Sequence, residues 1–367
     1  MNNVIATRAG TTRRPGLLVM AHYDSRPLSP GAADTAAGVA VVIETARLIA
    51  SGPPPLHDVV FLLTDAEEAG YLGIQAFTRD PRWKGAVRVA INLEARGNFG
   101  AVRMFETSVG NGWLIGQYSR AVSRPSASSL FYEIYKVLPN DTDFSVAKEA
   151  GFHGYNFAFV GGYAYYHTAA DTPHHLAVGS VQELGDQVTR LSMRLAAADT
   201  EGVDAADVVY FDLLRRWIAR YPVALALPLA CLAVIAVLWH IVGQLRRNEV
   251  KARGLAGGAL AYLVCVVVLP VLSLFGWLAI RATHPSYTVV STRPPFNAVY
   301  HMVALTGATV ALFTCVYAWL SRRALKTSLV GGALLVVAVL TIVAAVVIYA
   351  RQSSSSRREF LADSTGG

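Results

Sequence analysis

Four long stretches without any Asp, Glu, Lys or Arg occupy the second part of this 367-residue sequence. They run over residues 222–243, 254–280, 294–320 and 327–350. Each reaches the roughly 20 apolar residues that an α-helix needs to cross the hydrocarbon core of a bilayer. The sequence therefore predicts four transmembrane helices and excludes a wholly soluble protein.

The residues before these stretches have the mixed composition of a globular domain, and about 220 residues suffice for one domain with a sizeable core. We expect this domain at 1–205, a linker at 206–221, the membrane region at 222–350 and a disordered, serine-rich tail at 351–367. No secretory signal peptide opens the chain, because its first ten residues have no apolar core.

Charge and cysteine content exclude several classes of site. The net charge is +7, but many basic residues lie in short connectors between apolar stretches, where they set membrane orientation. We therefore expect no nucleic-acid partner.

All three cysteines, Cys231, Cys265 and Cys315, fall inside the apolar stretches. The first domain consequently has no thiol for a disulfide, a zinc finger or a cysteine nucleophile.

The first domain alternates short apolar runs with stretches of helical spacing. Strands are expected at 4–7, 16–21, 58–63, 87–93 and 155–160, and helices at 35–50, 71–78, 112–122, 142–150 and 181–197. This alternation predicts an α/β sandwich. In such folds, reactive side chains collect just past the carboxyl ends of the strands.

Metal-ligand side chains follow four of these expected strands. They are His22 after the run at 16–21, Glu67 and Glu68 after 58–63, Glu94 after 87–93 and His167 in the loop after 155–160. Asp34 stands among small residues at the start of a helix, where it could be only a helix cap. A single histidine at a strand end is usually structural, but recurrence at four strand ends favours a metal site.

Two histidines and three carboxylates form a nitrogen and oxygen ligand set that suits zinc. Their number favours two ions, bridged by one carboxylate and holding a hydroxide between them, and Asp34 is the natural bridge. Glu67 and Glu68 are neighbours and cannot both point the same way. One of them can bind metal while the other acts as a general base.

Two further carboxylates stand close to the histidines in sequence. Asp24 comes two residues after His22, and Asp171 comes four residues after His167. Carboxylates commonly accept the second ring N–H of a metal-binding histidine. Asp24 and Asp171 could therefore orient the two imidazoles.

Five ordered motifs then resemble the two-zinc aminopeptidase family, which also contains glutamate carboxypeptidases and glutaminyl cyclases. The motifs are His22-x-Asp24-Ser25, Gly31-Ala32-x-Asp34, Glu67-Glu68-x-Gly70, Asn92-Leu93-Glu94 and Tyr166-His167-Thr168-x-x-Asp171-Thr172. The resemblance covers about residues 4–200. Glu in Asn-Leu-Glu together with a multi-span membrane half is similar to the vacuolar membrane protease and endoplasmic reticulum metallopeptidase branch.

The resemblance implies a mixed-sheet α/β/α zinc-peptidase domain followed by a four-helix transmembrane region. It implies Asp34 as the bridge, His22 and Glu94 on one zinc, and Glu68 and His167 on the other. Glu67 becomes the general base. Tyr166 matches a position that stabilises the transition state, where a phenol could donate to the oxyanion. Tyr166 could also be an aromatic packing residue.

The sequence departs from the family pattern in three places. Glu94 replaces the Asp that many members have, and its longer side chain still reaches a metal. Asn140 takes the place of a Ser in a segment that forms the family's substrate pocket. The chain also begins almost at the His22 strand, without the helix, strand and export signal or anchor that usually precede it. We therefore expect a truncated amino terminus.

The sequence thus predicts a membrane-anchored zinc metallopeptidase, an aminopeptidase by resemblance, with a peptide substrate and the lipid bilayer as partners. The protein is expected to be multi-pass, with its peptidase domain on the non-cytoplasmic side, facing a bacterial periplasm or an organelle lumen. One alternative is a catalytically inactive, receptor-like or accessory domain. Another is a transporter. The four spans contain no Asp, Glu, Lys or Arg and only two histidines, His240 and His301, whereas an ion or proton pathway usually needs more ionisable residues.

Overall fold

The computed structural model describes residues 1–12, 14–83, 85–284, 287, 298–322 and 326–343. The chain divides into two compact units, Met1–Pro222 and Val223–Gly367. The expected disordered tail at 351–367 lies outside the described residues, as do the first residues of the expected third span and the last of the fourth.

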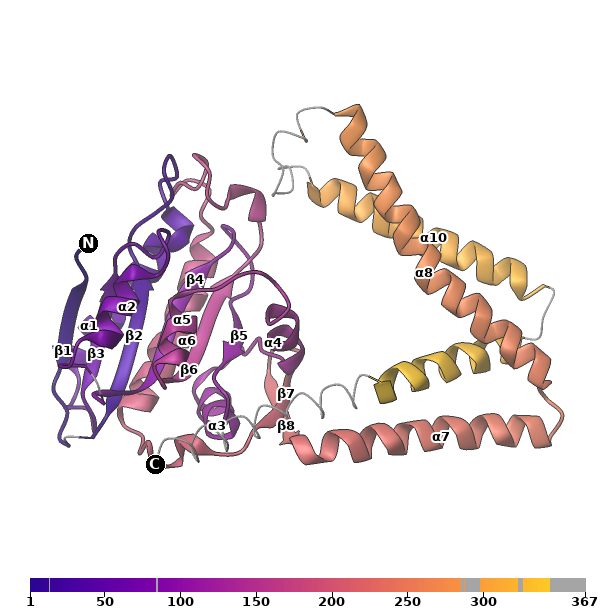
Figure 1. Ribbon diagram of the computed structural model, residues 1–367, viewed down its shortest axis with the longest axis horizontal. Coiled ribbons are helices and arrows are strands. Elements are labelled where there is room, and N and C mark those ends of the chain that lie inside the picture. The colour runs from indigo at the N-terminus through magenta and orange to yellow at the C-terminus, as the bar shows by residue number, and fades with distance from the viewer. Residues whose placement is uncertain (13, 84, 285–286, 288–297, 323–325, 344–367) are drawn as a thin grey trace. The chain divides into compact units, whose positions relative to one another are not determined.

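The first unit is built on a six-stranded mixed sheet (Figure 1). Its strands are β1 (Val4–Arg8), β2 (Gly16–His22), β3 (Val59–Thr64), β4 (Val87–Ala95), β5 (Arg103–Thr107) and β6 (His153–Phe159). The order is β1-β3-β2-β4-β6-β5; the four central strands are parallel and the two edge strands antiparallel to their neighbours. The predicted mixed sheet is confirmed.

The connections reverse direction between β2 and β4. The chain passes from β2 outward to β3 on one side, and from β4 outward to β6 on the other. Parallel strands that lead to opposite sides leave a crevice at their carboxyl ends, where α/β proteins bind ligands. His22 is the last residue of β2 and Glu94 is the penultimate residue of β4.

Helices cover both faces of the sheet, because the buried strands alternate apolar side chains between them. Leu17 and Val19 of β2 join one core with α1 (Ala37–Ser51), α3 (Gly112–Ala121) and α6 (Val178–Ala196). Leu18 and Met20 join a second core with α2 (Leu72–Arg79) and α5 (Asp143–Glu149). The predicted α/β/α arrangement is therefore confirmed.

The segment expected as a linker, 206–221, has a regular structure. It contains a hairpin of β7 (Val208–Leu213) and β8 (Trp217–Pro222), which belongs to the first unit. Tyr210 of β7 is buried in the core, and its N–H donates to Ser129 Oγ at the start of α4 (Ser129–Tyr135). Charged residues such as Asp212 and Arg215 interrupt this segment in the sequence, and periodicity contains no information about the pairing of its two strands, which explains the difference.

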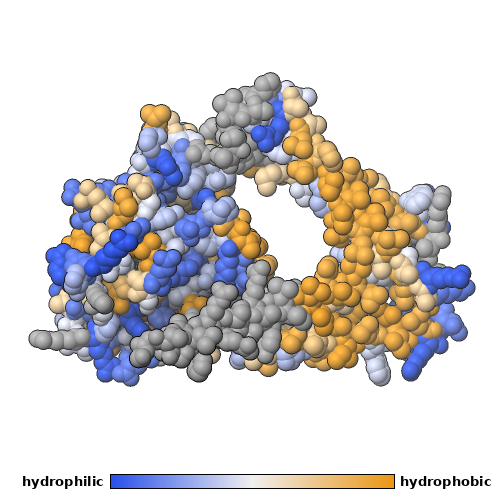
Figure 2. Space-filling view, in the orientation of Figure 1, coloured by the Kyte–Doolittle hydropathy of each residue, from blue (hydrophilic) through white to orange (hydrophobic). Residues whose placement is uncertain are grey.

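The second unit contains four helices long and apolar enough to cross a membrane, as predicted. They are α7 (Ala226–Arg246), α8 (Ala252–Thr283), α10 (Ala298–Leu320) and a fourth helix at Lys326–Val343. Hydrophobic side chains cover most of their visible surface (Figure 2). Gly258 of α8 packs against the fourth helix so closely that a Cβ there would lie 2.4 Å from the Ser328 carbonyl oxygen. Such contacts at small residues are typical of membrane helices.

Candidate metal centre

His22 presents one ring nitrogen to two carboxylates at the end of β2. Its Nδ1 lies 2.9 Å from the backbone oxygen of Asp24, which can only accept, so Nδ1 carries the hydrogen. Its Nε2 faces Asp34 Oδ1 at 3.4 Å and Glu94 Oε2 at 3.7 Å. The hydrogen bond at Nδ1 thus selects the tautomer in which Nε2 can bind a metal.

Asp34 lies in an irregular segment that directly precedes helix α1. The φ and ψ of Asp34 are −115° and 84°, the Asp34–Thr35 peptide is cis, and α1 begins only at Ala37 without a side-chain cap. The Asp171 carboxylate accepts the N–H groups of Ala33 (2.8 Å) and Asp34 (3.3 Å). Asp171 therefore fixes the backbone of the Asp34 segment, a role that sequence analysis did not assign to it.

The second oxygen of Asp34 faces the other predicted histidine. Asp34 Oδ2 lies 2.9 Å from His167 Nε2, and Glu68 Oε1 lies 2.6 Å from the same nitrogen. His167 has a φ of 55°, in the left-handed region that non-glycine residues rarely occupy. Backbone of this kind is concentrated at functional sites.

The five predicted ligands therefore lie in two groups that share Asp34. One group is His22, Asp34 and Glu94, the other is Asp34, Glu68 and His167, and within each the ligand atoms are no more than 4.8 Å apart. The remaining oxygen of each terminal carboxylate has its own donor. Glu94 Oε1 accepts from Asn92 Nδ2 (3.0 Å), and Glu68 Oε2 pairs with Arg26 Nε (2.7 Å).

Glu67 lies beside these groups without belonging to either. The chain turns after β3 at Ala66, whose φ is 59°, and the Asp24 carboxylate accepts the N–H groups of Glu67 (3.0 Å) and Glu68 (3.1 Å). Burial, followed by the charge of Glu94, raises the pKa of Glu67 to about 9. Asp24 thus holds the two glutamates in addition to its contact with His22.

Tyr166 stacks on the ring of His167, with centroids 3.7 Å apart. Burial, then the charge of Asp34, raises its pKa far above the ordinary value, so its phenol remains a hydrogen-bond donor. It also packs against Tyr163 and under the Arg96 guanidinium, which donates to Asn140 Oδ1 at 2.9 Å. These contacts agree with both interpretations of Tyr166.

The donor set and its electrostatics fit a cation. Burial raises the pKa of Glu94 to about 8, which reflects the cost of a buried charge. Asp34 Oδ2 and Glu68 Oε1 are buried, and both face the same nitrogen, His167 Nε2. Buried carboxylates usually pair with a cation or coordinate a metal. Two imidazoles and three carboxylates are the ligands zinc takes in catalytic sites.

Sequence analysis missed a polar chain behind Glu94. Asn92 Nδ2 also donates to Asn156 Oδ1 (3.1 Å), and Asn156 Nδ2 donates to Glu106 Oε2 (3.0 Å). Glu106 is buried and paired with Lys148. The signal available in the sequence was the two-residue spacing of Asn92 and Glu94, which puts them on the same face of a strand.

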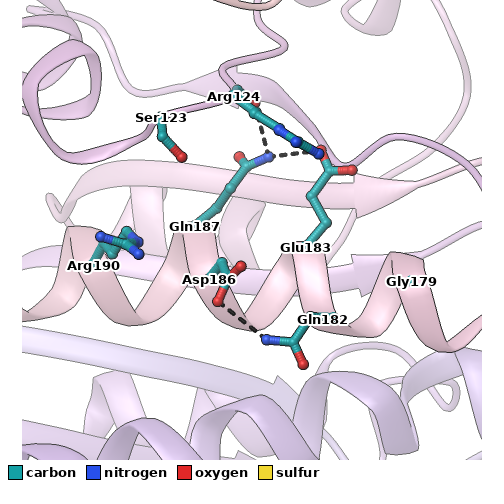
Figure 3. Close-up of a pocket in the computed structure, with 8 residues that line it drawn as sticks. All are labelled: Ser123, Arg124, Gly179, Gln182, Glu183, Asp186, Gln187 and Arg190. Carbon is teal, nitrogen blue, oxygen red and sulfur yellow. Dashed lines mark hydrogen bonds between the residues drawn. The ribbon is translucent and has the colours of Figure 1, made fainter.

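A separate polar hollow of about 370 Å³ lies beside α6 (Figure 3). Gln187 bridges it, with Nε2 donating to the Arg124 carbonyl oxygen (3.3 Å) and to Glu183 Oε1 (3.0 Å). The hollow contains none of the candidate ligands. The candidate centre is therefore defined by its ligand geometry and not by this hollow.

Comparison with known proteins gives consistent results. Residues 3–192 match Peptidase family M28. Endoplasmic reticulum metallopeptidase 1 of Mus musculus is 33% identical over 241 residues, which cover 64% of this chain and 27% of that protein. The vacuolar membrane protease of Lachancea thermotolerans is 31% identical over 218 residues, covering 58% and 22% respectively. This chain thus spans about a quarter of the length of these curated relatives.

Among solved structures, the zinc aminopeptidase BSAP from Bacillus subtilis aligns with a TM-score of 0.43 and 23% identity, over 56% of this chain and 53% of that one. The family match, by contrast, rests on sequence and extends over more than half of the 367 residues. It includes the whole sheet and all five candidate ligands. The chain belongs to peptidase family M28.

Proposed function

We propose that this protein is a membrane-embedded aminopeptidase that holds two zinc ions and removes the amino-terminal residue of a peptide. The observation that carries the proposal is the pair of ligand groups sharing Asp34. One carboxylate with its two oxygens directed at different histidines is the arrangement that two neighbouring metal ions require. Asp34 would bridge, with His22 and Glu94 on one ion and Glu68 and His167 on the other.

Bound zinc lowers the pKa of water toward about 7 and polarises a carbonyl oxygen. The remaining steps belong to the chain. Beside bound cations the raised pKa of Glu67 would fall, so that its carboxylate accepts a proton from the attacking water as the new C–O bond forms at the scissile carbonyl. It returns that proton to the amine as the C–N bond breaks. The phenol of Tyr166 donates to the oxyanion that develops on the substrate.

The exopeptidase assignment rests on the family resemblance, and a catalytically inactive receptor-like domain is the alternative. The presence of Glu67 beside a complete ligand set supports an enzyme, because a receptor has no need of a general base. The names of the relatives, an endoplasmic reticulum metallopeptidase and a vacuolar membrane protease, support proteolysis at a membrane. We further propose that the peptidase domain faces away from the cytoplasm.

The test uses the full chain, purified in detergent, stripped of metal and reloaded with zinc. Two peptides of one sequence are offered, one with a free amino terminus and one acetylated. Hydrolysis of the free peptide alone, lost in Glu67→Gln but kept in the exposed control Glu44→Gln, is the expected result. Cleavage of both peptides would replace aminopeptidase by endopeptidase activity. Cleavage of neither by the zinc-loaded protein would favour the receptor-like alternative.

A further inference from the structure

The β7–β8 hairpin has one face made only of apolar and aromatic side chains. Its strands pair with Phe211 opposite Ala219 and Leu213 opposite Trp217. Side chains alternate along each strand, and directly opposed residues share a face. The outer hairpin face, as we call it, therefore comprises Val209, Phe211, Leu213, Trp217, Ala219 and Tyr221.

The opposite face of the hairpin is attached to the domain. Tyr210 is buried in the core. Asp212 Oδ1 accepts the N–H of Ala127 (3.2 Å), and Arg220 Nη1 donates to the Gly112 carbonyl oxygen (3.3 Å). If the outer hairpin face were packed against the domain instead, these contacts would be lost. The outer hairpin face is consequently directed away from the domain.

Large apolar side chains of this face are exposed. Phe211 is 39% exposed, Leu213 46% and Trp217 62%. Leu214, in the turn next to this face, is 87% exposed. Helix α4 packs beside β7 (Figure 1), and Ser128 just before it pairs with Phe211 of the outer hairpin face. Contiguous apolar surface of this kind marks an interaction site.

The position of the hairpin in the chain indicates what covers it. β8 ends at Pro222, and the first candidate membrane span begins at the next residue, Val223. Trp217 is five residues from Pro222, or about 17 Å of strand. The whole outer hairpin face therefore lies within a short distance of the point where the chain enters the bilayer.

The side chains are those found at membrane surfaces. Trp and Tyr are enriched at the level of the lipid headgroups, and Arg near the surface is attracted to anionic lipids. Trp217 and Tyr221 lie on the outer face, and Arg216 is exposed in the turn. The only acidic residue of the hairpin, Asp212, is on the opposite face.

We propose that the outer hairpin face lies flat on the membrane surface, with Trp217 and Tyr221 among the lipid headgroups and Arg216 against their phosphates. The peptidase domain would then contact the bilayer at a second point besides its covalent link. This inference concerns lipid contact alone and does not depend on catalysis.

The test places an environment-sensitive fluorophore on the full chain in lipid nanodiscs. Cys231, Cys265 and Cys315 are replaced by Ala, and single cysteines are introduced as Trp217→Cys or, for control, Ile43→Cys. Ile43 is 56% exposed on α1 and thus matches Trp217 in exposure. Spin-labelled lipids should quench the label at 217 several-fold more than the label at 43, and iodide in the water should do the reverse.

An apolar fluorophore at 217 can itself favour insertion into lipid. A second set of variants therefore keeps the label at one position and changes the side chains around it. With the label at Leu214→Cys, the changes Leu213→Glu and Trp217→Glu should reduce lipid quenching to the level at 43. Zinc content and thermal unfolding should not change, because both residues are exposed. Arg216→Gln should weaken quenching in discs with anionic lipid and leave it unchanged in zwitterionic discs. Iodide access at 217 equal to that at 43 would overturn the proposal. Shielding from both quenchers would also overturn it and assign the face to a protein partner.

Discussion

Asn92 Nδ2 donates to Glu94 Oε1 over 3.0 Å, and this bond leaves Glu94 Oε2 as the oxygen that faces His22. Asn92 is itself fixed by its bond to Asn156, which leads on to buried Glu106. Glu has one more methylene than Asp and correspondingly more freedom to rotate. The Asn92 bond restricts that freedom, so we expect Glu94 to offer one oxygen to a metal.

Replacement of Asn92 by Leu should therefore weaken the metal site with little change in side-chain volume. Loss of a partner that orients a ligand typically costs about 10- to 100-fold in metal affinity or activity. Zinc retention during dialysis measures this without relying on turnover. Thr45→Val is the matched control, because it removes the hydrogen bond of another buried side chain, to Thr189, and neither residue is a candidate ligand. Equal zinc loss in both variants would show a general effect on folding.

Substitution of Glu67 by Gln should abolish nearly all hydrolysis while both metals remain bound. The amide keeps the shape of the side chain but cannot take the proton, and loss of a general base typically costs about 10² to 10⁴ in rate. Turnover and metal content are measured on the same preparation. Near-normal turnover at full metal occupancy would mean that another group is the base.

Removal of the shared carboxylate should have a larger effect on metal content than removal of a terminal ligand. Asp34 directs Oδ1 to His22 and Oδ2 to His167, so Asp34→Ala should lower occupancy of both positions. His167→Ala should mainly empty one. Metal analysis of the two variants decides between them, with thermal unfolding as the check on folding. Equal losses would favour a site with a single metal.

Much of the fold could be predicted from local patterns. The run at β2 is wholly buried and contains no charge before His22, so both its strand character and the placement of His22 at its end follow from the sequence. Parallel strands bring their carboxyl ends to one edge, which is why residues as far apart as His22 and Glu94 could be grouped. The distances between the ligand atoms agree with a metal site, and the role of each residue in it stays a prediction.

What could not be predicted depends on contacts between distant residues. β5 contains Glu106, a residue typical of exposed positions, yet it is buried because Lys148 of α5 pairs with it. Asp171 bonds to the backbone of Asp34 across 137 residues. Periodicity reports only which side of an element faces the core, and it contains no information about such partners.

The distribution of basic residues predicts which side of the membrane the peptidase domain faces. Basic residues are concentrated in two of the three connectors between spans: Arg246, Arg247, Lys251 and Arg253 after the first span, and Arg322, Arg323 and Lys326 after the third. The middle connector has only Arg281 and Arg293. Connectors rich in Lys and Arg remain in the cytoplasm, which puts the peptidase domain and the carboxyl terminus on the other side.

Two groups of basic residues would by themselves favour the reverse orientation: Arg215, Arg216 and Arg220 before the first span, and Arg351, Arg357 and Arg358 after the last. The first group counts for less, because Arg215 pairs with Glu183 and Arg220 donates to the Gly112 carbonyl oxygen. They belong to a folded domain, and the positive-inside rule applies chiefly to short loops. Protease should therefore leave the domain intact in sealed vesicles whose cytoplasmic face is outward, and digest it once they are permeabilised. A reporter fused after Gly367 should likewise be non-cytoplasmic. Digestion in sealed vesicles together with a cytoplasmic reporter would contradict the predicted orientation.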